Sequence, residues 1–293
     1  MIRKRRGVLY VAVLAAVAAP LLLWAVAQLT PTPRTALALP VTQVSRNSDT
    51  KSLVASNQDT ADLIKLAAAD PLALVRLGHE RHDRDIKDYR CVLTKQERVN
   101  GELSAVQKVD VRFRNEPRAV YMFWRENAGD AKRALYKKDA PGYVDDNGEA
   151  LVRVEPAGAI ARLFVSDIFV QLHGERARAA SRRTIDECGF DTLFHLMDQY
   201  CTTAKARNEL SLKFVGTGEV DGRPTFVIER RLPYEGEGGR YPDAKMVLHM
   251  DQEWLLPVAV ESYADPAGTQ LLGKYVFTQI ELNPGLTEAD FTF

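Results

Sequence analysis

The chain has 293 residues, and 46% of them are hydrophobic, which is enough for a packed core and excludes wholesale disorder. Basic and acidic residues number 39 each, but four of the basic ones lie at positions 3–6, which leaves 35 basic against 39 acidic residues in the remainder. That mildly acidic body lacks the concentrated basic surface of a nucleic-acid-binding domain, so no nucleic-acid partner is predicted.

The first 29 residues predict a membrane-targeting segment. Arg3-Lys4-Arg5-Arg6 precedes an uncharged run of 23 residues, Gly7 to Leu29. A helix rising about 1.5 Å per residue crosses the roughly 30 Å of bilayer hydrocarbon over such a length. Basic flanks stay in the cytoplasm. We therefore expect residues 8–29 to anchor the chain in the inner membrane by a single pass, with the body in the periplasm.

A cleaved signal peptide is the alternative interpretation of the same segment. Ala25-Val26-Ala27 has the small-residue spacing of a cleavage site, which would make Gln28 the mature N-terminus. The length of the apolar run favours the uncleaved anchor. Under either interpretation the body is exported.

Residues 30–59 are rich in Pro, Thr, Ser and Asn without periodicity, and we interpret them as a linker. A single domain is expected over residues 60–293. It should open with a short helix over Ala61 to Ala69, capped by Thr60 or Asp59. A second helix should begin at Asp70-Pro71, where a capping residue precedes proline at the first helical position.

Two short patterns resemble metal sites but are not interpreted as such. His79 and His82 stand three residues apart on the second helix, a usable ligand spacing, but no third ligand lies nearby. Asp145-Asp146-Asn147-Gly148 lacks the full ligand pattern of a calcium loop and predicts a hairpin turn. No metal and no cofactor are predicted.

The segment Tyr89 to Trp124 predicts three consecutive antiparallel strands. Asn100-Gly101 is a strong hairpin signal, because both residues accept positive φ. From Lys108 to Arg114 apolar and charged residues alternate, which places Val109, Val111 and Phe113 on one face. Glu116-Pro117 turns the chain into a run that is apolar on both faces.

The remainder predicts mostly strands with short turns and two helices. Expected strands cover Ala131–Lys138, a hairpin over Gly142–Val154, Glu209–Val220, Thr225–Leu232, Lys245–Asp251, Leu256–Tyr263 and Gln270–Leu282. Expected helices are Ile160–Leu172 and the more strongly amphipathic Phe190–Ala206, and the default interpretation of Arg176–Arg183 and Pro233–Pro242 is loop. This pattern predicts one curled antiparallel sheet with helices on one side.

Several segments are similar to a bacterial envelope family known only as a domain of unknown function. Asp88 to Arg98, followed by Asn100-Gly101, resembles its opening block, and Arg183 to Gly189 resembles its middle block. Further segments resemble a closing pattern shared with lipoprotein carriers of the LolA/LolB type: Leu256-Pro257-Val258, Glu261-Ser262-Tyr263, Tyr275-Val276-Phe277 and Asn283 to Phe291. The resemblance extends from Pro71 to Phe291.

The resemblance implies an α+β fold: a half-open, curled antiparallel barrel with helices against its concave face, here preceded by one N-terminal membrane helix. The carriers use that hollow to shelter lipoprotein acyl chains. They are soluble or lipid-anchored, whereas this chain has a predicted membrane anchor. The family has no established reaction, so the resemblance implies no site residues.

A curled sheet lined by methionine and aromatic side chains suits flexible acyl chains, because thioethers repack easily. The candidate cavity-lining residues are Met122, Trp124, Met246, Leu248, Met250 and Phe277. The alternative for each is a place in a packed core.

The three cysteines do not define a catalytic site. About 20 Å of helix separates Cys188 from Cys201, too far for a disulfide, whereas Cys91 paired with either one stays open. No nucleophile elbow, phosphate loop or dinucleotide fingerprint is present. We therefore predict a membrane-tethered periplasmic protein that binds a lipid, lipoprotein or other apolar ligand without catalysis. The alternatives are an envelope enzyme acting on a lipid or cell-wall component, and a scaffold without ligand.

Overall fold

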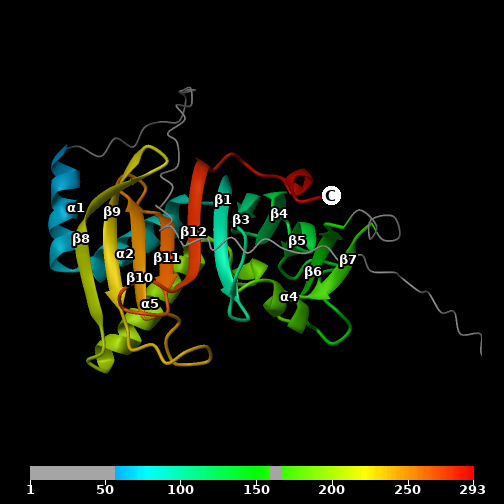
Figure 1. Ribbon diagram of the computed structural model, residues 1–293. Coiled ribbons are helices and arrows are strands. Elements are labelled where there is room, and N and C mark those ends of the chain that lie inside the picture. Colours follow the sequence, from blue (N-terminus) through cyan, green and yellow to red (C-terminus); the bar gives the residue numbers. More distant parts are fainter. Residues whose placement is uncertain (1–56, 159–165) are drawn as a thin grey trace, which may run out of the picture. The chain divides into compact units, whose positions relative to one another are not determined.

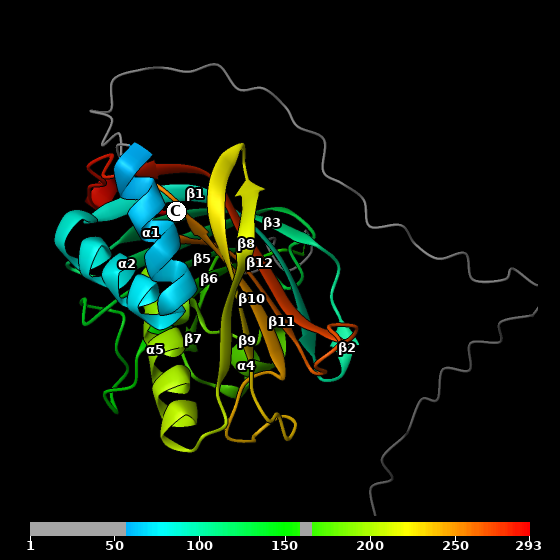
Figure 2. The same ribbon diagram turned by 90° about the vertical axis from the view of Figure 1, so that its left-hand side faces the viewer.

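Alternating apolar and polar side chains build one large sheet. The structure, a computed structural model, describes residues 57–158 and 166–293. Within them, twelve antiparallel strands form a curled, open sheet, and helices α1, α2 and α5 lie on one of its faces (Figures 1 and 2). The predicted α+β sheet is thus confirmed.

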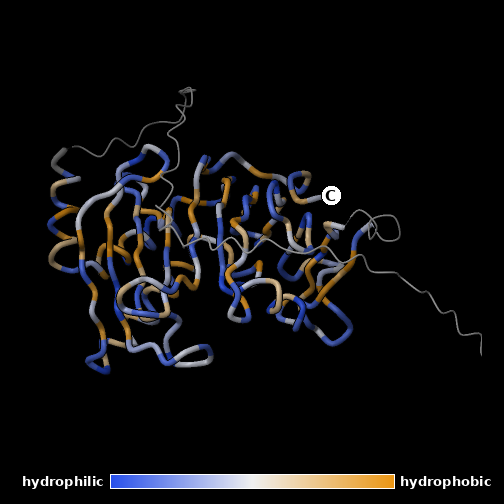
Figure 3. Tube along the Cα trace, in the orientation of Figure 1, coloured by the Kyte–Doolittle hydropathy of each residue, from blue (hydrophilic) through white to orange (hydrophobic). Residues whose placement is uncertain are grey.

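The strands follow one another along most of the chain. They are β1 (Asp88–Val99), β2 (Glu102–Leu103), β3 (Gln107–Arg114), β4 (Ala119–Glu126), β5 (Ala131–Lys137), β6 (Leu151–Pro156), β7 (Ile168–Gln171), β8 (Ser211–Val220), β9 (Arg223–Arg231), β10 (Lys245–Asp251), β11 (Pro257–Tyr263) and β12 (Leu271–Leu282). In Figure 3 hydrophobic and hydrophilic residues both occur along the strands, and many of the turns are hydrophilic.

Among the described residues the helices are fewer than the strands and lie in two groups along the sequence. They are α1 (Asn57–Ala69), α2 (Pro71–Asp85), α4 (Glu175–Ala180) and α5 (Phe190–Ala206), with short 3-10 turns η1 (Ile185–Glu187) and η2 (Glu288–Asp290).

Two meanders make up the sheet. The strand order is β7-β6-β5-β4-β3-β1-β12-β11-β10-β9-β8, with β2 paired to β1 alone. The early strands and the late strands therefore each form a run of neighbours, and the pairing of β1 with β12 joins the two runs. In that pairing Leu93 lies opposite Phe277, and Lys95 lies opposite Tyr275.

Local sequence signals act as predicted at the start of the fold. The Asp70 side chain accepts a hydrogen bond of 3.0 Å from the backbone N–H of Ala73, and Pro71 begins α2. The first helix begins at Asn57, a little before the predicted start at Ala61. Asn100 and Gly101 adopt φ values of 51° and 83°, so the hairpin after β1 is confirmed.

Helix α5 has the predicted bounds and supplies much of the core. Phe190, Phe194, Met197 and Cys201 are buried along one stripe that faces the sheet. The ring of Phe190 lies 5.0 Å from that of Phe277, centroid to centroid, so this helix packs against the middle of the sheet.

A second cluster explains why β4 is apolar on both faces. Val120 and Met122 belong to the main core, whereas Ala119 and Tyr121 pack with Phe291 in a separate cluster. The C-terminal residues thus cover the other face of the sheet at β4.

The predicted helix over Ile160–Leu172 is wrong where it can be compared with the structure. Ile168–Gln171 is strand β7, which pairs with β6, and residues 159–165 lie outside the described residues. Ile168 and Val170 alternate with the more exposed Phe169 and Gln171. Pairing with β6 selects this two-residue period over the helical spacing, as tertiary contacts often do for short apolar runs.

The default loop over Arg176–Arg183 also needs correction, because α4 spans Glu175–Ala180.

The predicted membrane segment, residues 8–29, lies outside the described residues. Among those that are described, no helix is both long and apolar enough to cross a bilayer. The predicted division into segment, linker and domain stays a prediction, and all described residues fall within one compact unit.

Replacing Gly78 by alanine should destabilise the protein. A Cβ at Gly78 would lie 2.5 Å from the carbonyl oxygen of Leu255 and 2.9 Å from Cε of Met250. Overpacking of this kind costs about 1–3 kcal/mol, whereas Gly→Ala in an open helix stabilises by about 1 kcal/mol. Urea unfolding measures the sign, with the exposed Glu80→Ala on the same helix as a control near zero. A gain in stability for Gly78→Ala would refute this close packing of α2.

Candidate binding cavity

A cavity of about 690 Å³ lies between the sheet and the elements α4 and α5. Its wall takes residues from β1, β3–β7 and β9–β12, with α4, η1 and α5 on the other side. Sites for small ligands span roughly 300–1,000 Å³. The volume is therefore that of a ligand site rather than of a packing defect.

Most of the wall is aliphatic. Strand residues that share the helix-bearing face contribute Leu93, Ala134, Val152, Val154, Ile168, Val170 and Val260, and α5 contributes Leu193, Leu196 and Met197. The alternation of the strands directs this apolar set to one side of the sheet.

Five of the six predicted lining residues border the cavity: Met122, Trp124, Met246, Leu248 and Phe277. The sixth, Met250, is fully buried beneath Gly78 of α2 and does not border it. Met246, Leu248 and Met250 share one face of β10, but α2 covers that face at Met250. Contact of these residues with a ligand stays a prediction.

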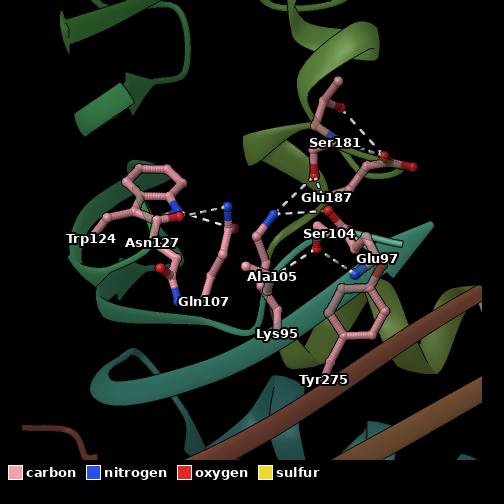
Figure 4. Close-up of polar contacts among 11 residues, drawn as sticks. Lys95, Glu97, Ser104, Ala105, Gln107, Trp124, Asn127, Ser181, Glu187 and Tyr275 are labelled. Atoms are coloured by element: carbon pink, nitrogen blue, oxygen red, sulfur yellow. Dashed lines mark hydrogen bonds and ion pairs between the residues drawn. The ribbon is translucent and has the colours of Figure 1, made fainter. Parts of the chain in front are cut away.

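A polar cluster interrupts the apolar wall (Figure 4). Glu97, which is 3% exposed, accepts hydrogen bonds from Tyr275 Oη at 2.7 Å and Ser181 Oγ at 2.8 Å. Lys95 Nζ lies 2.9 Å from the same carboxylate and 3.0 Å from Ser181 Oγ. Both carboxylate oxygens are therefore engaged, and the cluster ties the segment after α4 to the centre of the sheet.

The cluster holds Glu97 ionised. Burial by itself favours the neutral acid, but the charge of Lys95 and the hydrogen bonds from Tyr275, Lys95 and Ser181 outweigh it, so the pKa of Glu97 is lowered. Burial and the adjacent carboxylate raise the pKa of Tyr275 well above its ordinary value. At neutral pH the phenol therefore remains a donor to a carboxylate.

A second buried ion pair borders the cavity. Arg230 and Asp243 are 2% and 3% exposed, and Arg230 Nη2 lies 3.1 and 2.9 Å from the two carboxylate oxygens. The guanidinium also contacts Sδ of Met197 at 3.5 Å. This pair links β9 to the segment before β10 beneath α5.

Sequence reasoning missed these polar groups, although a signal was available. Leu93, Lys95 and Glu97 alternate along β1, so a lysine and a glutamate share the face of a core leucine. Charged residues on an inward-facing period usually have partners. The partners Ser181 and Tyr275 lie far away in sequence, and only the fold brings them together.

A family model described as "Protein of unknown function (DUF1571)" matches residues 86–293. The chain belongs to the DUF1571 family. The predicted membership of an uncharacterised family is thereby confirmed. No curated protein matches the chain by sequence.

Several solved structures are similar to this DUF1571 protein at low identity. Lipoprotein LppX of Mycobacterium tuberculosis has 16% identity and a TM-score of 0.42, over 74% of this chain and 98% of that one. LprF of Mycobacterium bovis has 10% identity and a TM-score of 0.39, over 75% and 96%. A LolA superfamily protein of Nitrosomonas europaea has 10% identity and a TM-score of 0.30, over 75% and 97%.

The cysteines of the DUF1571 protein are free thiols: Cys91, Cys188 and Cys201. The pairing of Cys91 with another cysteine, left open by the sequence, is thus not formed. Cys188 borders the cavity, and burial raises its pKa to about 12. The thiol therefore stays protonated at neutral pH, unlike an activated nucleophile.

The histidines of α2 lie apart from the cavity wall. Asp83 approaches both of them, at 3.5 Å from His79 Nε2 and 3.0 Å from His82 Nδ1. Within residues 57–158 and 166–293, no group of three or more His, Cys, Asp or Glu residues is arranged to hold a metal ion.

Replacing Glu97 by glutamine should destabilise the DUF1571 protein by about 3 kcal/mol at pH 7, because Lys95 then loses its buried counter-charge. Since folding lowers the pKa of Glu97, its stabilisation is present above the ordinary carboxyl pKa of about 4.3 and is lost as the pH falls through the folded-state pKa. Urea unfolding from pH 7 to pH 3 should show the wild type losing this advantage over the variant.

The matched control is Glu281→Gln, which breaks the exposed pair of Glu281 with Arg90. Exposed pairs contribute at most about 1 kcal/mol. Equal losses in the two variants would contradict a structural role for the buried cluster.

Proposed function

We propose that the protein binds the apolar chain of a lipid, a lipoprotein or a similar ligand in this cavity, without catalysis. The observation that carries the proposal is an aliphatic-walled cavity of about 690 Å³ in the body of the sheet. Protein interiors are otherwise close-packed, with few voids larger than a water molecule. A ligand that fills such a space restores contacts that the wall lacks.

The size of the cavity and the composition of its wall suit a ligand with a flexible apolar chain. Each buried methylene contributes about 0.8 kcal/mol, so ten of them contribute roughly 8 kcal/mol before the cost of ordering the ligand. Met122, Met197 and Met246 provide wall positions that adapt to chains of different shape.

The polar groups on the wall favour binding over catalysis. Lys95 and Ser181 are both hydrogen-bonded to Glu97, whose oxygens are already engaged. A general base needs a lone pair within reach of its substrate, and three of the roughly four lone-pair sites of this carboxylate are occupied. The pair of His173 and Asp186, 3.5 Å apart, borders a different hollow, and the His173 side chain is 55% exposed.

We place the protein in the bacterial envelope, with residues 8–29 as a single-pass inner-membrane anchor and the body in the periplasm. Support comes from the basic residues at positions 3–6 and the uncharged run that follows them. An apolar binding site held beside a membrane is close to a source of lipid.

Filling the cavity should abolish ligand binding. Val154 borders the cavity, and Val154→Trp adds a large side chain where the ligand chain is proposed to lie. The full-length wild type should retain lipid through mild extraction, visible by native mass spectrometry, and should bind dodecanol in calorimetric titrations. The variant should bind dodecanol at least about ten-fold more weakly, a loss of about 1.4 kcal/mol.

The control is Val215→Trp, because Val215 is 54% exposed on β8 and borders neither hollow. It should bind as the wild type does. Wild-type protein that neither retains lipid nor binds dodecanol would defeat the proposed function.

Mass spectrometry of the intact protein from membranes should find residues 1–29 still attached, because an apolar run of 23 residues is long for a cleaved signal. Alkaline carbonate should leave the protein in the membrane pellet. A mature chain that starts at Gln28 would rule out the anchor and leave an exported, untethered body.

A further inference from the structure

A second hollow, of about 580 Å³, adjoins the apolar cavity, and we call it the polar basin. The two share Ser181, Arg182, Thr184, Glu187, Tyr200 and Pro242 as common wall. Beyond that boundary the basin is lined by Arg98, Arg178 and the glycine-rich turn at 236–239. An apolar compartment that opens beside a polar one is suited to an amphiphile, with its chain in one and its head group in the other.

Two of the three arginines on the basin wall have no ion-pair partner among the described residues, and the third is paired with an exposed carboxylate. Arg98 donates to the backbone carbonyls of Leu271 at 3.0 Å and Gly101 at 2.8 Å, which fixes its position. The Arg178 side chain is exposed, with no ion-pair partner among the described residues. Arg182 approaches Glu237 only at 3.5 Å, and the Glu237 side chain is 67% exposed.

The basin wall also holds three acids, Asp186, Glu187 and Glu237, and each has a hydrogen-bond or ion-pair partner. Asp186 accepts from Thr184 Oγ1 at 2.6 Å and lies near His173. Glu187 pairs with Arg183 at 3.1 Å and accepts from the backbone N–H of Thr184 at 2.9 Å. The wall thus carries three acids and three arginines, and Arg98 and Arg178 are the arginines without an ion-pair partner among the described residues.

We propose that the polar basin binds the anionic head group, a carboxylate or a phosphate, of an amphiphile whose chain lies in the apolar cavity. The inference rests on the proposed function and specifies its ligand class. Guanidinium groups present planar donors that match the oxygens of both anions. Arg182 belongs to both walls and marks the boundary where head group and chain join.

The test compares two probes of one chain length, dodecanoate and dodecanol, at pH 8. The full-length protein is kept soluble in a non-ionic amphipathic polymer, and tryptophan fluorescence reports binding because Trp124 borders the cavity. Wild type should bind dodecanoate at least ten-fold more tightly than dodecanol. The variant Arg178→Glu, at a residue that borders the basin but not the apolar cavity, should lose that preference and bind dodecanol as before. Lys213→Ala, an exposed site on β8 that borders neither hollow, should behave as wild type.

Each of the other outcomes would overturn the head-group inference, the proposed function, or both. Equal binding of both probes by wild type would overturn the head-group inference and leave the proposed function standing. Binding of neither probe would overturn both. Inorganic phosphate is the third probe: if phosphate alone binds as tightly as dodecanoate, the basin is a site for free anions and the amphiphile inference is overturned.

Discussion

The pairing of β1 with β12 is the contact on which the rest of the structure depends. It joins two meanders, made from distant parts of the chain, into one sheet, and the cavity wall draws on both. The register places Leu93 opposite Phe277 and Lys95 opposite Tyr275. A slip of one residue would turn these side chains to the other face of the sheet. The same pairing therefore determines which side chains form the apolar wall and which form its polar cluster.

The buried charges are best understood as supports for a hollow interior. In a packed core, side chains fill the space between the elements and fix their separation. Around a cavity that space is not filled, so hydrogen bonds and ion pairs between the wall elements fix their positions instead. Glu97 with Ser181 ties the segment after α4 to the sheet, and Arg230 with Asp243 ties β9 to the segment before β10. A desolvated ion pair contributes little net stability, but breaking it is costly. These buried contacts therefore hold the elements of the cavity wall in one arrangement.

The amphiphilic character of the site arises from where α4 and η1 lie. Their apolar residues close the cavity, while Arg178 of α4 and Asp186 of η1 border the adjoining basin, and Arg182 between the two elements borders both hollows. One short segment thus separates two environments of opposite polarity. This arrangement supports the proposed ligand with an apolar chain and a charged end more than it supports a purely apolar one.

The sequence by itself determined the local elements: alternation predicted most strands, Asn100-Gly101 the first hairpin, and Asp70-Pro71 the start of α2. It also predicted the bounds of α5 and placed five of six chosen residues beside the cavity, because face and period are local properties. Only the tertiary structure decided the rest. Pairing with β6 made Ile168–Gln171 a strand, α2 covered Met250, and the closure of the sheet brought Tyr275 and Ser181 to Glu97. Those outcomes depend on contacts between residues far apart in the chain, which local periodicity does not encode.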